Sequence, residues 1–288
     1  MKIAIMTDVN AGLDYVGYET GVYCLRSSIN FPNQAPLVDG IDIRADEFYE
    51  RIKNITKSSE IPSTSAPSVA DIYATLDELI DKGYTDVIHF PISFELSSTG
   101  QTVQMLADEY KDKINVHVIN TKTAAFMQGY IALEAKRMAD EGKTVEEIIE
   151  YSSYLIDNNQ VYFLVDDLNY LVKNGRLSNA AGFLGSLFKI KPILSITKEG
   201  KIESIEKVRT YQKALKRVEE LITEYIGNHE KIALFGFHSN RIDSLTELLN
   251  GVTEKRPDLA GAPIHYITPA VGAHIGCGVI AIAAFKLK

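Results

Sequence analysis

Short apolar runs alternate with amphipathic segments along the whole chain, and this alternation constrains the fold more than any other feature. Residues 2–6 and 86–92 have the apolar character of buried strands, whereas Ile72, Leu76 and Leu79 recur at the spacing of one helix face. Strands that alternate with helices are typical of an α/β architecture, which is the fold class that we predict.

A polar break near the middle of the chain divides it into two parts. The break is Asp157-Asn158-Asn159-Gln160, and strand and helix patterns continue on both sides of it. A chain of 288 residues is long enough for two domains. We therefore predict an N-terminal α/β domain over residues 1–158 and a C-terminal α/β domain over residues 159–288.

Turn and capping signals predict several local structures. Ser68 with Asp71, and Thr144 with Glu147, have the spacing of capping boxes at the starts of two helices. Two prolines and four hydroxyl residues make residues 61–68 a loop. Other expected elements are an extended segment over 23–31, an apolar helix over 180–188, and a hairpin of 190–197 with 201–208.

Composition excludes several classes of partner. The net charge is −8 and the pI is near 5.4, so the chain lacks the basic face that nucleic acid or an anionic membrane surface requires. No apolar run approaches the roughly 20 residues of a membrane span.

Cys24 and Cys277 have neither disulfide nor metal spacing, and the scattered histidines offer no metal site. We expect a cytoplasmic protein with free thiols, no signal peptide and no stable membrane insertion.

Two hydroxyl-rich segments precede predicted helices. Residues 63–65 read Ser-Thr-Ser ahead of the helix that Ser68 caps, and Ser93 follows the buried strand 86–92. Hydroxyls at such positions can donate hydrogen bonds to an anion, and ligands of open α/β sheets bind beyond the carboxyl ends of strands. The alternative for both segments is ordinary helix capping and turn formation.

A glycine-rich segment near the C-terminus surrounds a single histidine. Residues 271–278 read Val-Gly-Ala-His-Ile-Gly-Cys-Gly, and we interpret them as a loop before the last strand. Glycines allow a close approach of backbone to ligand, and the imidazole of His274 can donate a hydrogen bond or carry a charge. The alternative is a tight turn whose histidine is satisfied by backbone. Arg176 and Arg209 are weaker candidates, because a lone arginine is usually a solvated surface charge.

Six segments, taken in order, resemble the DegV family over essentially the whole chain. They are Thr7-Asp8, Thr64-Ser65-Ala66-Pro67-Ser68, Ile92-Ser93-Phe94-Glu95-Leu96-Ser97-Ser98-Thr99, Leu171-Val172-Lys173-Asn174-Gly175-Arg176-Leu177-Ser178, Lys207-Val208-Arg209-Thr210 and Gly272-Ala273-His274-Ile275-Gly276-Cys277-Gly278. This family includes the fatty-acid-binding subunits of the bacterial fatty acid kinase. The resemblance implies two α/β domains, an apolar tunnel for the acyl chain, and a carboxylate held at the domain interface.

The resemblance also implies roles for individual residues. Arg176 and Arg209 correspond to residues near the entrance that serve the encounter with the kinase. The carboxylate-binding group corresponds to Thr64, Ser65, Ser93 and His274.

Several positions depart from the family pattern. The family usually has Gln at Ala66, Gly at Ser98 and Pro at Cys277, and residues 9–14 also differ. Phe94 occupies a ligand-binding position at which the family usually has a second serine. The phenyl ring has no hydroxyl, so one hydrogen bond that the family makes to the ligand head group lacks its donor here.

The implied function is lipid binding rather than catalysis. The chain would hold one long-chain fatty acid, without a cofactor, and present its carboxylate to a separate ATP-dependent kinase that forms the acyl phosphate. The sequence has no nucleotide-phosphate loop, so the ATP would lie on the partner. Apolar residues that could line a tunnel, or could equally form an ordinary core, are Phe126, Met127, Phe183, Leu184, Leu187, Phe188 and Ile190.

Three other functions stay open. Ser93, His274 and Asp8 could form the triad of an acyl hydrolase, although no nucleophile elbow accompanies the serine. The chain could instead carry another amphipathic acid, which Phe94 favours. It could also have a purely structural or regulatory role with an empty site.

Overall fold

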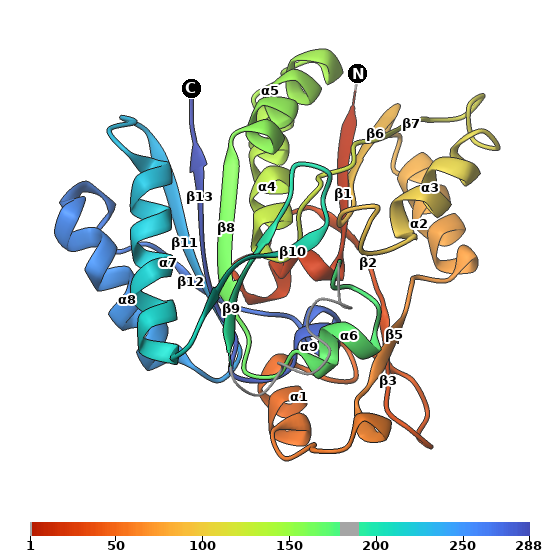
Figure 1. The fold of residues 1–288 in the computed structure, drawn as a ribbon. Helices are drawn as coiled ribbons and strands as arrows, with labels where there is room; N and C mark the ends of the chain where they lie inside the picture. The colour runs from red at the N-terminus through yellow and green to blue at the C-terminus, as the bar shows by residue number, and fades with distance from the viewer. Residues whose placement is uncertain (1, 179–189) are drawn as a thin grey trace.

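A computed structural model describes residues 2–178 and 190–288 as layers of helices and sheets (Figure 1). Three sheets are present in this part of the chain, and helices separate and cover the two larger ones. The predicted α/β class is confirmed. In the same residues, no helix combines the length and the apolarity that crossing a membrane requires.

The first sheet has four parallel strands in the order β2-β1-β6-β7. Its strands are β1 (Ile3–Asp8), β2 (Tyr23–Leu25), β6 (Asp86–Phe90) and β7 (Asn115–Val118). Helices α2 (Val69–Asp81) and α3 (Thr99–Ala107) bury their apolar faces against one side of it. On the other side lie α4 (Phe126–Asp140) and α5 (Val145–Asp157). Both predicted capping boxes are confirmed, at the starts of α2 and α5.

The second sheet has six strands in the order β10-β9-β8-β13-β11-β12. Its strands are β8 (Asn159–Leu164), β9 (Lys191–Ile196), β10 (Ile202–Val208), β11 (Ile232–His238), β12 (Ile264–Tyr266) and β13 (Ile280–Lys286). Helices α7 (Tyr211–Ile226) and α8 (Ile242–Lys255) cover its outer face. The predicted hairpin is confirmed as the antiparallel pair of β9 and β10.

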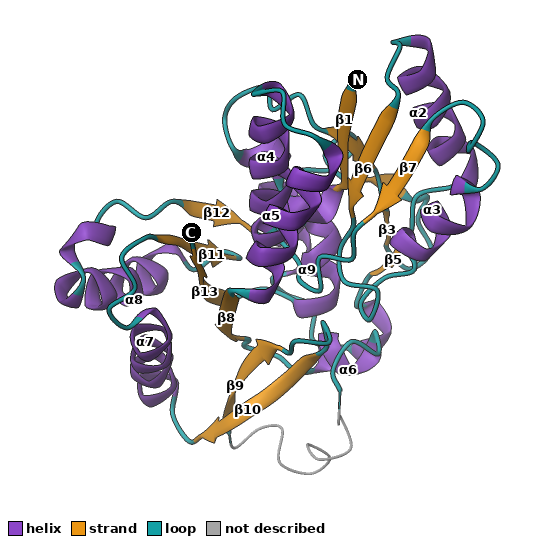
Figure 2. Ribbon diagram, turned by 90° about the horizontal axis from the view of Figure 1, so that it is seen from above, coloured by secondary structure: helices purple, strands orange, loops and turns teal. Residues whose placement is uncertain are grey.

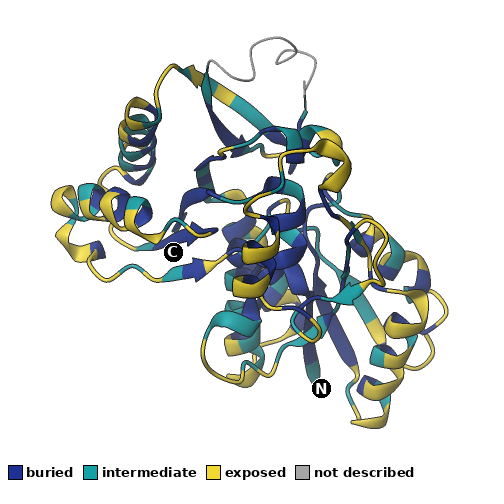
Figure 3. Cartoon of the chain, turned by 90° about the horizontal axis from the view of Figure 1, so that it is seen from below, coloured by how far each residue is buried: buried dark blue, intermediate teal, exposed yellow. Residues whose placement is uncertain are grey.

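Helix α4 packs between the two larger sheets and joins them (Figure 2). The Tyr130 ring centroid lies 5.0 Å from that of Phe235 and 4.9 Å from that of Phe285, and Phe126 stacks on His265 at 3.6 Å. These residues belong to a core that contains side chains from both halves of the chain. The predicted boundary between residues 158 and 159 falls between α5 and β8, so the two predicted domains share this core. Figure 3 shows the buried residues gathered there and the exposed ones on the outer helices.

A small antiparallel sheet of order β4-β3-β5 lies beside these layers, next to α1 (Ala45–Ile52). Its strands are β3 (Ser28–Asn30), β4 (Leu37–Val38) and β5 (Ser63–Ser65). The predicted loop was therefore wrong at residues 63–65, because β3 offers backbone hydrogen-bond partners that local sequence does not reveal. The extended structure predicted over 23–31 is confirmed in β2 and β3, although these two strands join different sheets.

Two short helices, α6 (Asn169–Lys173) and α9 (Pro269–Ile275), complete the region around the cavity described below. The prediction of a loop over 271–278 was wrong for its first five residues, which belong to α9. Thr268 caps this helix, and Pro269 occupies its first turn. Gly272 serves packing rather than flexibility, because a Cβ there would lie 2.5 Å from the Tyr49 hydroxyl. The helix predicted over 180–188 lies outside the described residues.

Candidate ligand-binding site

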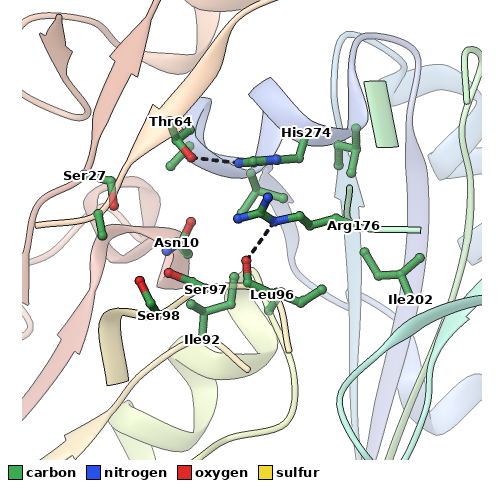
Figure 4. A pocket seen from close by; sticks show the side chains of 15 residues that line it. Asn10, Ser27, Thr64, Ile92, Leu96, Ser97, Ser98, Arg176, Ile202 and His274 are labelled. Atoms are coloured by element: carbon green, nitrogen blue, oxygen red, sulfur yellow. Dashed lines mark hydrogen bonds between the residues drawn. The ribbon is translucent and has the colours of Figure 1, made fainter. Parts of the chain in front are cut away.

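A cavity of about 210 Å³ lies where the carboxyl end of β1, the small sheet and α9 meet (Figure 4). Strands, helices and loops from both halves of the chain contribute to its wall. Its polar side chains are those of Asn10, Ser27, Thr64, Ser97, Ser98, Arg176 and His274. The remainder of the wall is apolar, so the cavity presents a small group of polar atoms within a hydrophobic setting.

Among the described residues, Arg176 is the only charged one in the wall of this cavity. Its Nε donates a hydrogen bond to the Leu96 carbonyl at 3.1 Å, and its Nη1 donates to the carbonyl of Asn174. Its Nη2 has no hydrogen bond to any described residue. The described part of the wall holds this guanidinium and no carboxylate, which favours an anionic ligand.

His274 and Thr64 are neighbours in the cavity wall, although they lie 210 residues apart in sequence. The Nε2 atom of His274 lies 2.8 Å from Oγ1 of Thr64, and Nδ1 has no partner among the described residues. Burial, with the nearby Arg176 cation, lowers the pKa of His274 to about 4. The imidazole is therefore neutral at pH 7. If Nε2 carries its proton and donates to Thr64, the Thr64 hydroxyl is free to donate to a carboxylate.

This lowered pKa predicts that His274 destabilises the fold in acid. Between the unfolded-state pKa of 6.5 and the folded-state pKa of about 4, the unfolded chain binds more protons than the folded one. Stability is thus retained above pH 6.5 and lost as the pH falls toward 4. His274→Gln removes the titrating group. Between pH 7 and pH 5, we therefore expect the free energy of unfolding of the wild type to fall by about 2 kcal/mol more than that of the variant.

Urea unfolding of the wild type and His274→Gln at both pH values measures this difference. Comparison with the wild type is needed because burial raises the pKa of Asp39 to about 7. Protonation of Asp39 therefore stabilises the fold as the pH falls, which opposes the effect of His274. Asp39 is present in both proteins, so its contribution cancels. An identical pH dependence in the two proteins would contradict the neutral, buried imidazole.

A second cavity, of about 60 Å³, adjoins the first and is lined by apolar side chains. Met127 of α4, Phe163 of β8 and Phe237 of β11 contribute to its wall. The two cavities have four lining residues in common, which are Ala124, Ile202, Val271 and Ile275. A polar cavity therefore adjoins an apolar one, which is the arrangement that an amphipathic acid requires.

Ser93 lies close to this site but lines neither cavity. Its side chain is fully buried, and its hydroxyl donates to the Gly200 carbonyl at 2.9 Å. Gly200 has a φ of +90°, and a Cβ there would lie 2.1 Å from the Ser93 oxygen, so only glycine fits. A ligand could reach Ser93 only if the turn between β9 and β10 moved. The predicted contact of Ser93 with a carboxylate stays a prediction.

Three other predicted site residues also lie outside both cavities. Ser65 is exposed and accepts a hydrogen bond from Asn30 at 2.9 Å. The half-buried ring of Phe94 lies close against Gly100, and Arg209 is exposed after β10. Their predicted roles stay predictions. The structure thus brings together Thr64, Arg176 and His274 from the predicted set.

The predicted tunnel residues are similarly divided. Met127 lines the apolar cavity, whereas Phe126 stacks on His265 in the core. Ile190 lines a separate surface depression beside β9. The other candidates, Phe183, Leu184, Leu187 and Phe188, lie outside the described residues.

The hydrolase alternative requires Ser93, His274 and Asp8 to form a hydrogen-bonded chain. Asp8 is fully buried and accepts hydrogen bonds from the Ile92 amide at 2.9 Å and from Asn10 at 2.6 Å. His274 contacts Thr64, and Ser93 contacts Gly200. The hydrogen bonds of the described residues therefore do not link the three groups into a triad.

Sequence reasoning missed four polar residues of the cavity, which are Asn10, Ser27, Ser97 and Ser98. Ser27 lies within the segment expected to be extended, and its exposed fraction is only 5%. Nothing in its sequence neighbourhood distinguishes it from a strand serine. The division of that segment between two sheets is what turns Ser27 toward the cavity wall, so only the topology identifies it.

Comparison with known proteins agrees with this picture. The model of the DegV family, described as a family of uncharacterised proteins, matches residues 2–287. A DegV domain-containing protein of Streptococcus pneumoniae is 32% identical over 290 residues, which cover 98% of each chain.

Solved structures match over essentially the full length. A fatty acid binding DegV family protein of Streptococcus agalactiae is 30% identical, with a TM-score of 0.90 and 100% of each chain covered. DegV of Bacillus subtilis, described as a fatty acid binding protein, is 29% identical, with a TM-score of 0.85 and 99% of each chain covered. The chain therefore belongs to the DegV family.

Proposed function

We propose that this protein binds one long-chain fatty acid and presents its carboxylate to a separate ATP-dependent fatty acid kinase. The observation that carries the proposal is the pair of adjoining cavities. The described residues of one include a single cation and no carboxylate, and those of the other are apolar. The fatty acid binding described for the Streptococcus agalactiae and Bacillus subtilis relatives supports the same ligand class.

The acyl chain supplies most of the binding free energy in this proposal. Burial of about fourteen methylenes, at about 0.8 kcal/mol each, gives on the order of 11 kcal/mol before ordering costs. The apolar cavity of about 60 Å³ holds only a few of these methylenes. Binding of a long chain therefore requires the apolar wall to separate, and the increase in buried apolar area should give a negative heat-capacity change.

The head group fixes the orientation of the ligand. A buried carboxylate must be hydrogen-bonded, because otherwise it takes up a proton. The Thr64 hydroxyl, with neutral His274 behind it, supplies an uncharged donor, and Nη2 of Arg176 supplies a charged one. We place the carboxylate among these three side chains, with the acyl chain directed past Ala124 and Ile202 into the apolar cavity.

The kinase partnership is the finer part of the proposal. Exposed Ala66 and Ser98 belong to the cavity wall, so the polar end of the cavity lies next to solvent. A partner that carries ATP could reach the carboxylate from that side. This chain would act as a binding subunit without catalytic groups of its own, and no cofactor is required.

Titration of lipid-free protein with saturated fatty acids of increasing length tests the proposed ligand class. We expect the affinity to rise by at most about fourfold per added methylene, the ratio that corresponds to about 0.8 kcal/mol. Isothermal titration calorimetry at two temperatures measures both the affinity and the heat-capacity change. An affinity that does not depend on chain length, or no uptake of any fatty acid, would contradict the proposal.

A further inference from the structure

A buried carboxyl group, that of Asp39, lies directly behind the wall of the polar cavity. Asp39 follows β4 and is fully buried. It lines neither cavity, but its backbone amide donates to the Ser27 carbonyl at 3.0 Å, and its Oδ2 accepts from the Ala270 amide at 2.7 Å. Ser27 and Ala270 both belong to the wall of the polar cavity. Asp39 is therefore one residue away from the space in which we place the ligand carboxylate.

The hydrogen bond between Asp39 and Ala270 fixes helix α9. Ala270 lies in the first turn of this helix, where backbone amides have no partner within the helix. Thr268 accepts the bond from one such amide, and Oδ2 of Asp39 accepts the bond from Ala270, which lies 231 positions away in sequence. Because α9 also carries His274, the Asp39 carboxyl group helps to determine where the imidazole lies in the cavity wall.

The second oxygen of this carboxyl group, Oδ1, is buried and has no hydrogen-bond partner among the described residues. The nearby Arg26 guanidinium pairs with Asp14, and it donates only to the backbone carbonyl of Asp39, at 3.1 Å. Arg44 lies over the Tyr15 ring, 5.0 Å from the ring centroid. A buried carboxylate with an unpaired oxygen is costly. A proton on Oδ1 removes this cost without disturbing the bond that Oδ2 accepts.

The side chains around Asp39 only partly compensate a negative charge on it. The titratable groups that interact with Asp39 are Asp14, Tyr15, Cys24, Arg26, Arg44 and Tyr49. The phenols and the thiol are neutral at pH 7, because burial raises their pKa values. The two arginines outnumber the one aspartate, yet burial has the larger effect and raises the pKa of Asp39 to about 7. Asp39 is therefore close to half protonated at neutral pH.

A ligand carboxylate in the polar cavity would add a second negative charge beside Asp39. Repulsion between like charges is strong in a buried site, and it favours protonation of one of the two groups. In the proposed function the ligand carboxylate accepts hydrogen bonds from Thr64 and Arg176, which stabilise its charge, whereas Oδ1 of Asp39 accepts none. Asp39 is therefore the group that takes the proton.

We infer that Asp39 is a positioning residue of the head-group site, which fixes α9 through the Ala270 amide and takes up a proton on Oδ1 when the fatty-acid carboxylate binds, an inference that rests on the proposed function. The proton comes from solvent, and no covalent bond of the ligand changes. The bond from Ala270 is present in both protonation states, so α9 stays in place while the charge behind the cavity wall disappears. His274 stays neutral throughout, because its pKa is about 4.

Calorimetric titration of the full chain with laurate, in buffers that differ in their enthalpy of ionisation, counts the protons taken up on binding. If laurate raises the pKa of Asp39 by about one unit, the wild type takes up about half a proton per ligand at pH 7.5. Its affinity for laurate should fall by up to about tenfold from pH 6 to pH 9, because Asp39 is protonated at pH 6 and carries its charge at pH 9.

Two substitutions separate the charge of Asp39 from its hydrogen bond. Asp39→Asn retains an oxygen for the Ala270 amide and places an uncharged group where Oδ1 lies. It should take up no proton and bind laurate equally well at pH 6 and pH 9. Asp39→Ala removes the acceptor, so it should weaken binding at both pH values. Asp86→Asn is the matched control, because Asp86 is a buried aspartate at the start of β6 that lines neither cavity. It should take up protons as the wild type does.

The outcomes distinguish this inference from the proposed function. Wild-type protein that binds laurate without proton uptake would overturn the inference and leave the proposed function intact. Uptake that persists in Asp39→Asn would also overturn the inference, and this count decides even if Asp39→Ala does not fold. Equal affinities of wild type and folded Asp39→Ala at pH 6 would show that Asp39 does not position α9. Wild-type protein that binds no laurate would overturn the proposed function itself.

Discussion

Replacement of Ala124 by phenylalanine is expected to lower the affinity for palmitate about 100-fold. Ala124 lines both cavities where they meet, so a phenyl ring there obstructs the path from the head-group site to the apolar cavity. Loss of about four buried methylenes costs about 3 kcal/mol, which corresponds to this change in affinity. The dependence of affinity on chain length should disappear as well, because longer chains gain no further buried area.

Titration of Ala124→Phe with the same series of fatty acids measures both effects. Ala107→Phe is the matched control, because Ala107 is also half-buried but lies at the end of α3 and lines neither cavity. The control should bind palmitate as the wild type does. Retention of the wild-type dependence on chain length by Ala124→Phe would show that the acyl chain does not pass between the two cavities.

The second large effect concerns the charge of the head-group site. Arg176→Glu replaces a cation of the cavity wall by a carboxylate, beside the position that we assign to the ligand carboxylate. It removes a charge-assisted hydrogen bond, worth about 1.5–3 kcal/mol, and adds a repulsion between like charges. We expect the affinity for palmitate at pH 8 to fall by about 100-fold or more.

Arg209→Glu makes the same charge change at an exposed residue outside both cavities, so it serves as the control. It should leave palmitate binding unchanged. Arg176→Gln, which retains a donor for the Leu96 carbonyl, separates loss of charge from loss of folding, and thermal unfolding of each variant checks the fold. Equal palmitate affinities for Arg176→Glu and Arg209→Glu would contradict a carboxylate site beside Arg176.

The elements that could be predicted from the sequence are those set by local chemistry. The capping boxes at Ser68 and Thr144 require only residues three positions apart, and the β9–β10 hairpin is marked by its turn at Gly200. Thr64 and His274 were identified as site residues because the family pattern connects them across 210 positions. No local rule relates two side chains at that separation.

The elements that were missed depend on contacts distant in sequence. Residues 63–65 become β5 only because β3 pairs with them, although Ser-Thr-Ser by itself favours a turn. Glycines suggested a loop around His274, yet Gly272 lies in α9, where Tyr49 leaves no space for a larger side chain. Ser27 enters the cavity wall through sheet topology, which periodicity in the sequence does not specify.

Native mass spectrometry of the protein purified without added lipid, followed by denaturation and identification of the released molecule, tests the central claim most directly. The account predicts a single fatty acid at a ratio of one per chain, and its chain length would set the ligand for the titrations above. A mass without ligand, combined with no uptake of added fatty acids from C12 to C18, would contradict the account. Release of a lipid without a carboxylate would contradict it as well, because the site described here is built for an anionic head group.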